Sequence, residues 1–312
     1  MKIAYLILAH KDPDHLARLA ERLSKTGDSF IYIDKKSNIK EFEGKLCAVE
    51  GVYLERDRIS VAWGGWSMVK AYMQLLQKVL ESPKKYSRIV LMTGQDYPLM
   101  SDSQILQAFE ENPTVEYVMA YKVMTSRLLS DRNKIQKKWF FDFPLKNIFL
   151  TKVYRRIMYY CVTRPFRYNI KSVKLNGKEV DFYFGQKLSA FTRECAELIL
   201  KTYLEDKKFN KIMRRVYAPD ELYWQTIVFN SSFRENTIQH GEEHEVTDHF
   251  GFAPLHYHNY DEQVIVYKED DFEELKHSGY MFFKKAQTGI SDKLLDKIDE
   301  WRNEKENISR FK

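Results

Sequence analysis

Hydrophobic and polar positions alternate along the first hundred residues in the manner of a layered α/β protein. Residues 3–9 are almost entirely apolar, which predicts a buried strand. Residues 14–24 carry leucine and alanine at helical spacing, which predicts an amphipathic helix. Further strands are predicted at 30–33, 52–54 and 88–92, and a long helix at 67–80. Together these elements indicate a doubly wound sheet flanked by helices.

Three polar residues follow predicted strands closely. His10 and Asp34 come directly after the first and second strands, and Asp96 follows the fourth strand after a short Thr–Gly–Gln stretch. Ligands of open α/β sheets gather at the carboxyl ends of the strands. We therefore expect His10, Asp34 and Asp96 to share one cleft.

The second half of the chain is less regular, and no linker separates it from the first. We therefore expect a single domain over residues 1–312. The elements predicted there are a hairpin near Asn176–Gly177, a helix from about Thr192 to Tyr203, another helix beginning near Pro219, and a charged amphipathic helix from about Asp292.

Composition narrows the classes of protein. The chain has 312 residues, 44% of them hydrophobic, and three cysteines without a CxxC pair, so neither a disulfide framework nor a zinc site is indicated. The first predicted turn lacks GxGxxG, and no Walker A loop occurs, which argues against a nucleotide dehydrogenase or P-loop enzyme. The apolar start is too short for a signal peptide or a membrane span. We expect a cytoplasmic protein, soluble or peripheral at the inner face of the cell membrane.

The net positive charge of the chain is modest, but the basic residues are concentrated in one segment. The net charge is +6, but residues 134–171 hold ten Lys or Arg against the single acid Asp142, interleaved with aromatic residues. This composition fits an anionic membrane surface, or equally a helical insertion with core aromatics and solvated lysines. It also resembles a nucleic-acid surface, but no recognisable binding module frames it, so we expect no nucleic-acid partner.

Five ordered stretches carry a family resemblance. They are Ala4–His10 with Tyr32–Ser37, Val61–Ser67, Leu91–Leu99, Pro219–Glu221 and Ser278–Lys285, and they span roughly residues 3–290. As an ordered set they resemble the core-2/I-branching β-1,6-N-acetylglucosaminyltransferase family, which also contains the peptide O-xylosyltransferases. The resemblance implies a GT-A fold, a Rossmann-like mixed sheet flanked by helices, that binds a UDP-sugar. It divides the chain into a nucleotide-binding half (1–100), an acceptor and catalytic half (101–290) and a C-terminal helix (291–312).

The same resemblance implies roles for the second-half motifs. Lys284 and Lys285 stand where the family carries basic residues that replace a metal ion on the diphosphate, although a solvated lysine pair is the commoner arrangement in proteins. Glu221 matches the catalytic base; alternatively it and Asp220 simply favour a helix N-terminus. The Asp-x-Asp at Asp12–Asp14 is interpreted as a helix cap rather than a metal site.

In the first half, Asp34 and His10 are expected to line the nucleotide pocket, with a turn or cap as the alternative for Asp34. Trp63 places a flat ring beside two glycines, which let the backbone approach a ligand. In the same motif Trp66 could equally be core and Ser67 an N-cap. Asp96 is expected to bind ribose or the donor sugar, with bracing of the backbone as the alternative.

The chain also departs from the family pattern. An arginine that touches the diphosphate in vertebrate members would fall near Glu262, and His256, His258 or Lys268 could compensate. The His-x-His pair also allows a metal hypothesis, but two ligands without a third are a weak signal. The segment Phe184–Arg193 differs as well, which leaves the donor sugar open.

We therefore expect an inverting, metal-independent transferase that needs no cofactor besides its UDP-sugar substrate. The expected donor is UDP-N-acetylglucosamine and the acceptor a glycan or lipid-linked glycan, in surface polysaccharide synthesis. The alternatives are a xylosyltransferase or other UDP-hexose transferase, and a non-catalytic glycan- or nucleotide-binding protein on a degenerate transferase fold.

Overall fold

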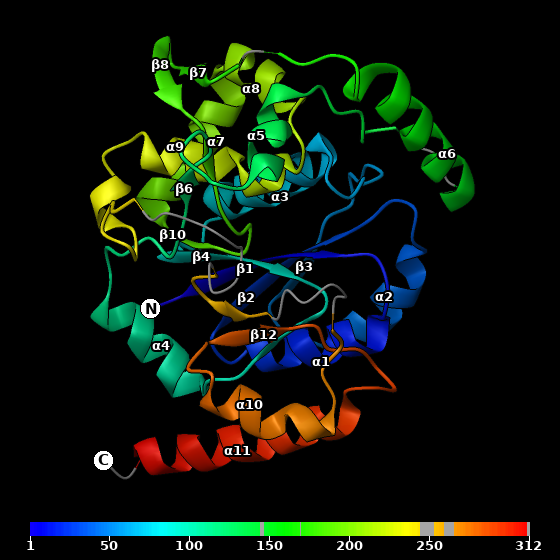
Figure 1. Ribbon diagram of the computed structural model, residues 1–312. Coiled ribbons are helices and arrows are strands. Elements are labelled where there is room, and N and C mark those ends of the chain that lie inside the picture. Colours follow the sequence, from blue (N-terminus) through cyan, green and yellow to red (C-terminus); the bar gives the residue numbers. More distant parts are fainter. Residues whose placement is uncertain (144–146, 169, 244–252, 259–264, 311–312) are drawn as a thin grey trace.

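The fold is built around one central sheet, in a computed structural model that describes residues 1–143, 147–168, 170–243, 253–258 and 265–310 (Figure 1). Its five strands lie in the order β10-β4-β1-β2-β3. The strands are β1 (Ile3–Ala9), β2 (Gly27–Ile33), β3 (Val52–Leu54), β4 (Arg88–Thr93) and β10 (Ala190–Thr192). The first four run parallel, and β10 is antiparallel to β4, which confirms the mixed Rossmann-like sheet.

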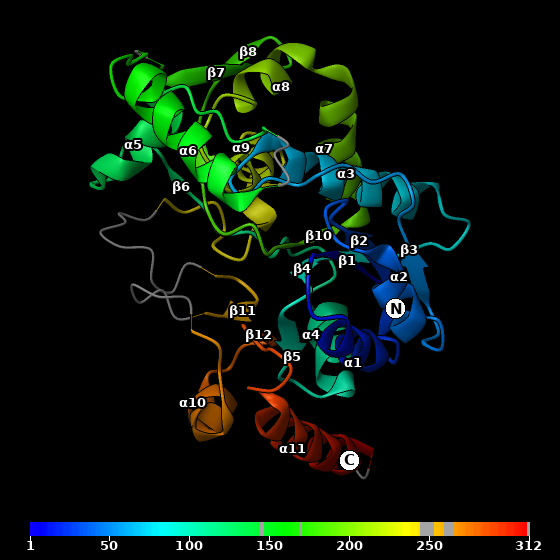
Figure 2. The same ribbon diagram turned by 90° about the vertical axis from the view of Figure 1, so that its right-hand side faces the viewer.

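Helices cover both faces of the sheet (Figures 1 and 2). One face packs against α1 (Pro13–Leu23) and α2 (Ile39–Leu46), and the other against α3 (Trp66–Glu81). From β1 the chain moves to one side of the sheet through β2 and β3, and it then crosses back to the other side of β1 at β4. The point where strand order reverses is therefore between β1 and β4, where sheets of this kind open a crevice at their carboxyl ends.

The cap interpretation of Asp12–Asp14 is confirmed. Asp12 caps α1 by accepting from the His15 amide at 3.2 Å, and Pro13 occupies the first helical turn. The Asp12 carboxylate also accepts from the amide and hydroxyl of Thr288, at 2.8 and 2.6 Å. The first turn of the chain is thereby tied to the segment that follows Lys285.

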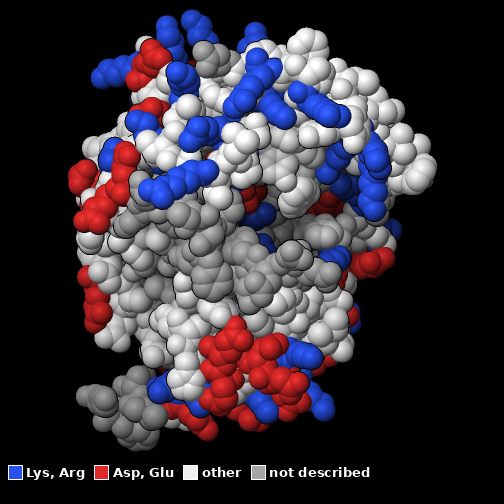
Figure 3. All heavy atoms as spheres, in the orientation of Figure 1, with Lys and Arg blue, Asp and Glu red and all other residues white. Residues whose placement is uncertain are grey.

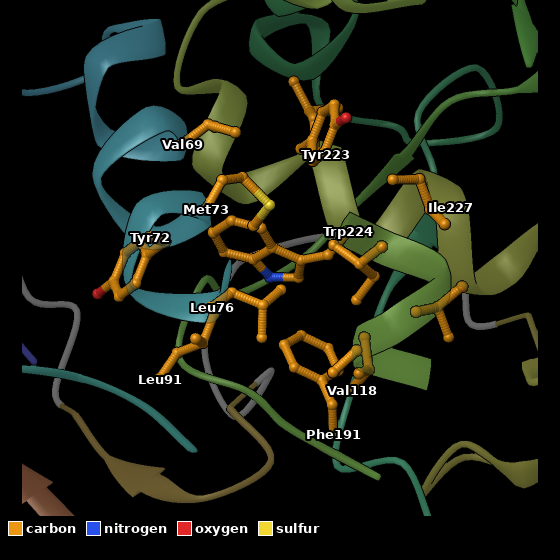
Figure 4. Close-up of a cluster of buried hydrophobic side chains, with 14 of the residues drawn as sticks. Val69, Tyr72, Met73, Leu76, Leu91, Val118, Phe191, Tyr223, Trp224 and Ile227 are labelled. Carbon is orange, nitrogen blue, oxygen red and sulfur yellow. The ribbon is translucent and has the colours of Figure 1, made fainter. Parts of the chain in front are cut away.

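The second half adds helices to the α3 face, namely α7 (Arg193–Glu205), α8 (Lys207–Met213) and α9 (Tyr223–Phe229). Trp224 of α9 is fully buried among apolar side chains of α3, β4 and β10 (Figure 4). The helix predicted to begin at Pro219 starts instead as a 3₁₀ turn, η2 (Pro219–Glu221), because Leu222 leaves helical geometry with φ −127°. The α-helix then begins at Tyr223.

A second sheet of three strands lies beside α1, in the order β11-β12-β5. It consists of β5 (Asp96–Pro98), β11 (His256–Tyr257) and β12 (Phe282–Lys284). Strand β12 runs antiparallel to β5 and pairs Lys284 with Asp96. The helices α4 (Asp102–Glu111), α10 (Phe272–His277) and α11 (Asp292–Arg310) pack beneath this sheet, with the turn η4 (Glu269–Asp271).

The remaining elements form the upper layer of Figure 1. The predicted hairpin at Asn176–Gly177 is confirmed, with both turn residues at positive φ. The elements are β6 (Tyr121–Lys122) paired with β9 (Tyr183–Phe184), the hairpin β7 (Ser172–Leu175) and β8 (Lys178–Asp181), the helices α5 (Leu129–Gln136) and α6 (Ile148–Met158), the π-helical turn η1 (Tyr159–Thr163), and the 3₁₀ turn η3 (Arg234–Asn236). Within the described part of the chain, no helix combines the length and the apolarity needed to cross a membrane.

Candidate active site

A pocket of about 310 Å³ lies at the carboxyl ends of β1, β2 and β4, at the reversal of strand order. It brings together five residues that the sequence singled out from distant parts of the chain: His10, Asp34, Trp63, Lys284 and Lys285. A wider groove of about 800 Å³ shares His10, Asp34 and Trp63 with this pocket and extends to α6. Figure 3 shows cationic atoms inside the hollow at the centre of this face.

Asp34 anchors a loop that forms one wall of the pocket. Its Oδ1 accepts from the amides of Lys36 at 3.0 Å and Val61 at 3.3 Å, and Lys36 Nζ lies 3.2 Å from Oδ2. The residue is 7% exposed. The carboxylate therefore belongs to the pocket wall and fixes that wall at the same time.

The glycine motif after Val61 links the pocket to the second half of the chain. Trp63 is 64% exposed at the pocket mouth, with its ring edge-on to Tyr217. Gly64 has φ +72°, a conformation that side chains disfavour, and its carbonyl accepts from the Ala218 amide at 3.2 Å. Ala218 precedes the turn Pro219–Glu221. This backbone hydrogen bond therefore links the loop beside the pocket to the turn that carries the Glu221 carboxylate.

The rest of that motif is structural. Trp66 is buried in the core, as the alternative interpretation had it. The N-cap of α3 is Gly65 rather than Ser67, and Asp142 supplies the missing acceptor by receiving bonds from the Ser67 amide and hydroxyl at 3.0 and 2.6 Å. The single acid of the basic segment is thus placed at the positive end of a helix.

The lysine pair concentrates positive charge in the pocket. Lys284 is buried, and this burial, together with neighbouring Lys187 and Lys285, lowers its pKa to about 8. Burial, Lys11 and Lys187 lower the pKa of Lys285 as well. Ammonium groups that crowd one another in this way favour an anionic ligand, and a diphosphate has the charge and the oxygens to pair with several of them.

Asp96 lies behind this pair and does not line the pocket. Its carboxylate is fully buried, receives hydrogen bonds from the amide and hydroxyl of Thr93, and lies 3.1 Å from His256 Nε2. The pKa of Asp96 is lowered by His256 and Lys284 although burial opposes this. The expected contact of Asp96 with ribose or sugar is therefore not made available by this geometry, which agrees with the bracing alternative.

Glu221 occupies the end of the short turn η2. Its carbonyl accepts from Gly185 N at 2.9 Å, and its amide donates to Ala218 O at 2.9 Å, so the backbone on both sides is fixed. Desolvation of the carboxyl and the adjacent Asp220 raise its pKa to about 7, while Lys134, Lys187 and Lys284 partly oppose the rise. A carboxylate with this pKa is suited to accept a proton near neutral pH.

Two further lysines, Lys187 and Lys134, act electrostatically on Glu221, and the sequence analysis does not identify them as site residues. Lys187 is part of the pocket wall, and its Nζ lies 3.6 Å from Asp220 Oδ2. Both interpretations of the basic segment expect exposed lysines, which is wrong for Lys134, whose side chain is 12% exposed. Burial lowers its pKa, and its ammonium group lies 3.2 Å from the ring centroid of Phe184 and 3.2 Å from Asp131 Oδ1.

Some sequence signal for these two lysines existed. Lys187 lies within the segment Phe184–Arg193, and the only signal in that segment is its departure from the family pattern. Lys134 forms an i,i+3 ion pair with Asp131, but such pairs usually lie on helix surfaces. Nothing local distinguishes this one as buried.

The two histidines near the pocket have different environments. His256 stacks on Phe282 and faces Asp96, whereas burial and the charges of Lys284 and Lys285 lower the pKa of His258 to about 4. Among the described residues, no group of three His, Cys, Asp or Glu side chains could hold a metal ion. Lys268 is exposed at the start of a 3₁₀ turn, and Glu262, where the missing arginine would fall, is outside the described residues.

The aromatic residues of the segment 134–171 are only partly buried. Trp139 and Phe141 stack on each other and pack around Tyr217. Several other aromatic side chains are 38–56% exposed, so the interpretation that the aromatics of this segment form core is wrong for them. They are Phe143, Tyr159, Tyr160 and Phe166.

Comparison with known proteins agrees with this geometry. The family model described as Core-2/I-Branching enzyme matches residues 3–275. The human N-acetyllactosaminide beta-1,6-N-acetylglucosaminyl-transferase is 23% identical over 235 residues, which cover 72% of this chain and 52% of the human protein. A bovine beta-1,3-galactosyl-O-glycosyl-glycoprotein beta-1,6-N-acetylglucosaminyltransferase is 22% identical over 231 residues, covering 72% and 48%.

A more distant similarity extends to another sugar. Xylosyltransferase sqv-6 of Caenorhabditis elegans is 20% identical over 213 residues, which are 67% of this chain and 24% of the nematode protein. The chain therefore spans about half the length of the two N-acetylglucosaminyltransferases and about a quarter of the xylosyltransferase.

Proposed function

This chain belongs to the Core-2/I-Branching enzyme family, and from that premise we propose that it is an inverting glycosyltransferase that moves a sugar from a UDP-sugar to a hydroxyl of a glycan acceptor. N-acetylglucosamine is the proposed donor sugar, because the human and bovine relatives are named for its transfer. Xylose is the second candidate, on the strength of the nematode relative. A surface polysaccharide as the product stays a prediction.

One observation carries the proposal, namely that two of the cations that line the pocket lie close enough to the Glu221 carboxylate to oppose the rise of its pKa. Lys284 and Lys187 both act on the charge of Glu221, and both line the pocket with Lys285. Transfer from a UDP-sugar requires positive charge where the diphosphate departs and a proton acceptor where the hydroxyl attacks. The lysines of the pocket would meet the first requirement and Glu221 the second.

The proposed step is a single displacement. The acceptor oxygen forms a bond to the anomeric carbon while the bond from that carbon to the β-phosphate oxygen breaks. The acceptor proton passes to the Glu221 carboxylate, and Lys284 and Lys285 balance the negative charge that develops on UDP. Because the attack comes from the face opposite UDP, an α-linked donor gives a β-linked product.

Independence of a metal ion belongs to the same proposal. Many transferases of this fold place a divalent ion on the diphosphate, and here ammonium groups would supply the charge. What supports this is that Lys187, Lys284 and Lys285 all line the one pocket, so that several ammonium groups could pair with a diphosphate there. Transfer should then persist in excess chelator, and loss of activity in chelator with recovery on adding manganese would refute this part.

The test is the variant Glu221→Gln. Turnover should fall by roughly 10² to 10⁴, the usual contribution of a positioned base, because the amide cannot take the acceptor proton. UDP should still raise the melting temperature of the variant, since the lysines that bind it remain. The matched control is Glu300→Gln in α11, an exposed glutamate, which should keep wild-type turnover.

A donor screen separates the remaining alternatives. Wild-type protein is incubated with UDP-N-acetylglucosamine, UDP-xylose and UDP-hexoses, and both transfer and donor hydrolysis are measured. The donor with the highest kcat/KM identifies the sugar. If UDP stabilises the fold but no UDP-sugar is transferred or hydrolysed, the protein is a binding module on a transferase fold and the proposal fails.

A further inference from the structure

Helix α6 presents its apolar side chains outward. Surface helices of soluble proteins normally turn their apolar face to the core. In α6 and the turn that follows it, five apolar side chains are between 39% and 70% accessible. We call this set the outer face of α6, and it consists of Phe149, Leu150, Val153, Ile157 and Tyr160.

The inner side of the same helix contacts the protein through Arg155 and Tyr154. Arg155 points to the body of the protein, where its Nη2 donates to Trp63 O at 3.2 Å and its guanidinium lies 4.4 Å from the Phe141 ring centroid. Tyr154 stacks on Phe143 with ring centroids 4.3 Å apart. None of the side chains described for α6 is fully buried. The helix is therefore held to the protein by its inner residues, and its apolar face is left without a partner among the described residues.

The charge around the outer face has one sign. Residues 147–168 contain five Lys or Arg and no Asp or Glu. Lys152 and Arg156, both exposed, precede Val153 and Ile157 by one position each and so flank the apolar stripe. In Figure 3 the surface over α6 is white and blue. A partner that complements this face must be apolar at its centre and anionic around it.

We propose that the outer face of α6 docks on the surface of a lipid bilayer that contains anionic lipids. Apolar side chains of the outer face enter the boundary between headgroups and acyl chains, and Lys152 and Arg156 pair with lipid phosphates. The helix has 11 residues, far too few to span a bilayer, so it lies in the plane of the interface.

A nucleic-acid partner fits this face less well. Single-stranded nucleic acids bind through cations and aromatic stacking platforms. The centre of the outer face is formed by the aliphatic residues Leu150, Val153 and Ile157, which offer no such platform. Aliphatic side chains between cations match acyl chains beneath phosphates instead.

The position of α6 connects this surface to the cleft. Lys152 and Arg155 line the groove of about 800 Å³ that also contains His10, Asp34 and Trp63. A bilayer on the outer face therefore lies next to the groove. Resting on the proposed transferase function, this arrangement favours an acceptor that is itself carried by a lipid.

The experiment measures binding to vesicles and requires no sugar transfer, so it is independent of the proposed function. Wild-type protein is sedimented with vesicles of phosphatidylcholine alone and of phosphatidylcholine mixed with phosphatidylglycerol. We expect binding to the mixed vesicles that is at least about tenfold tighter and that weakens as salt is added. Equal binding to both vesicles, or none to either, would overturn the proposal.

Two double variants separate the apolar and the charged contributions. Phe149→Ser with Ile157→Ser, and Lys152→Glu with Arg156→Glu, should each weaken binding to the mixed vesicles at least about tenfold. The matched control is Leu204→Ser with Ile290→Ser, two residues that are 44% and 48% exposed elsewhere, and it should bind like wild type. The melting temperature of the Phe149/Ile157 variant should stay close to that of wild type, which shows that it folds. If this variant binds as wild type does, the outer face is not the docking site.

A fluorescent label on Cys161, the residue after Tyr160, gives a second measurement of vesicle binding without any change to the outer face of α6. Cys161 and Cys47 are exposed and Cys195 is buried, so an environment-sensitive fluorophore can be placed on Cys161 in a Cys47→Ser protein, or on Cys47 in a Cys161→Ser protein. Mixed vesicles should increase the emission only of the Cys161 label. An equal response of both labels contradicts docking through α6. So does a response to protein concentration alone, which would make the outer face a contact between copies of the chain.

Discussion

At the residue scale, Glu221 and Lys284 have pKa values shifted toward each other. Desolvation and Asp220 raise the pKa of Glu221 to about 7, and burial with Lys187 lowers that of Lys284 to about 8. The proposed reaction needs Glu221 ionised and Lys284 protonated. Both conditions hold together only in a narrow range of pH between these two values.

This overlap predicts a bell-shaped pH profile of kcat/KM. The rate should rise as pH passes about 7, because Glu221 loses its proton, and fall as pH passes about 8, because Lys284 loses its charge. In Lys284→Arg the descending limb should move up by roughly one pH unit or more, since a guanidinium stays charged. Initial rates at fixed low donor concentration across pH 5–10 test this. A descending limb that stays in place in Lys284→Arg would assign it to another group.

At the scale of elements, the sequence predicts the strands and helices whose own residues show an apolar run or a helical spacing of apolar residues. The strand at Ile3–Ala9, the strand at Val52–Leu54 and the helix over Trp66–Glu81 have the expected bounds to within one residue. The sequence does not predict the strands β5, β11 and β12, because their pairing joins segments far apart in the chain. An element of that kind is defined by its partner strand.

The residues of the candidate site likewise fall into those that the sequence identifies and those that only tertiary packing reveals. Residues at strand ends and in the family motifs, such as His10, Asp34 and Lys284, were found because their neighbours in sequence mark them. Lys134 and Lys187 were missed because only tertiary packing brings them to Glu221. Asp96 was found but its orientation was not, since its burial depends on the pairing of β5 with β12.

The buried Trp224 offers a test of how α9 supports the site. Trp224 lies in the core three residues after Glu221, and its ring is edge-on to Tyr72 at 5.8 Å (Figure 4). Trp224→Ala should lower the free energy of unfolding by about 3–5 kcal/mol, the usual cost of so large a cavity. The control Trp63→Ala removes a ring that is 64% exposed and should change it by less than about 1 kcal/mol. Urea unfolding measures both, and equal costs would mean that Trp224 is not a core anchor.

At the scale of the whole molecule, the C-terminal helix α11 is hydrogen-bonded to α1 and to strand β5 of the second sheet. Asp299 of α11 accepts from Arg18 at 2.7 Å, from Arg22 at 2.9 Å and from the hydroxyl of Tyr97, a residue of β5, at 2.9 Å. The carboxylate is almost entirely buried, with 8% of the side chain exposed. One side chain thus joins parts of the chain that are some 200 to 280 residues apart.

Removing this carboxylate should loosen the whole tail. Asp299→Ala leaves Arg18 and Arg22 partly buried and short of a partner, so we expect a loss of about 3–5 kcal/mol in the free energy of unfolding. Asp296→Ala is the matched control, because Asp296 also pairs with Arg18 at 2.7 Å but is 67% exposed, and it should cost no more than about 1 kcal/mol. Thermal or urea unfolding compares the two. Similar losses would show that burial of the Asp299 pair contributes nothing.

The place of β12 in the second sheet has a consequence for how the protein is made. Lys284 and Lys285 enter the pocket only when β12 pairs with β5, and 183 residues separate Pro98 from Phe282. While the chain emerges from the ribosome, His10 and Asp34 are already present, but the ammonium pair that would hold a diphosphate is still to be synthesised. Nascent chains that end before β12 therefore gain no stability from the nucleotide, and any chaperoning effect of UDP begins only after β12 has been synthesised.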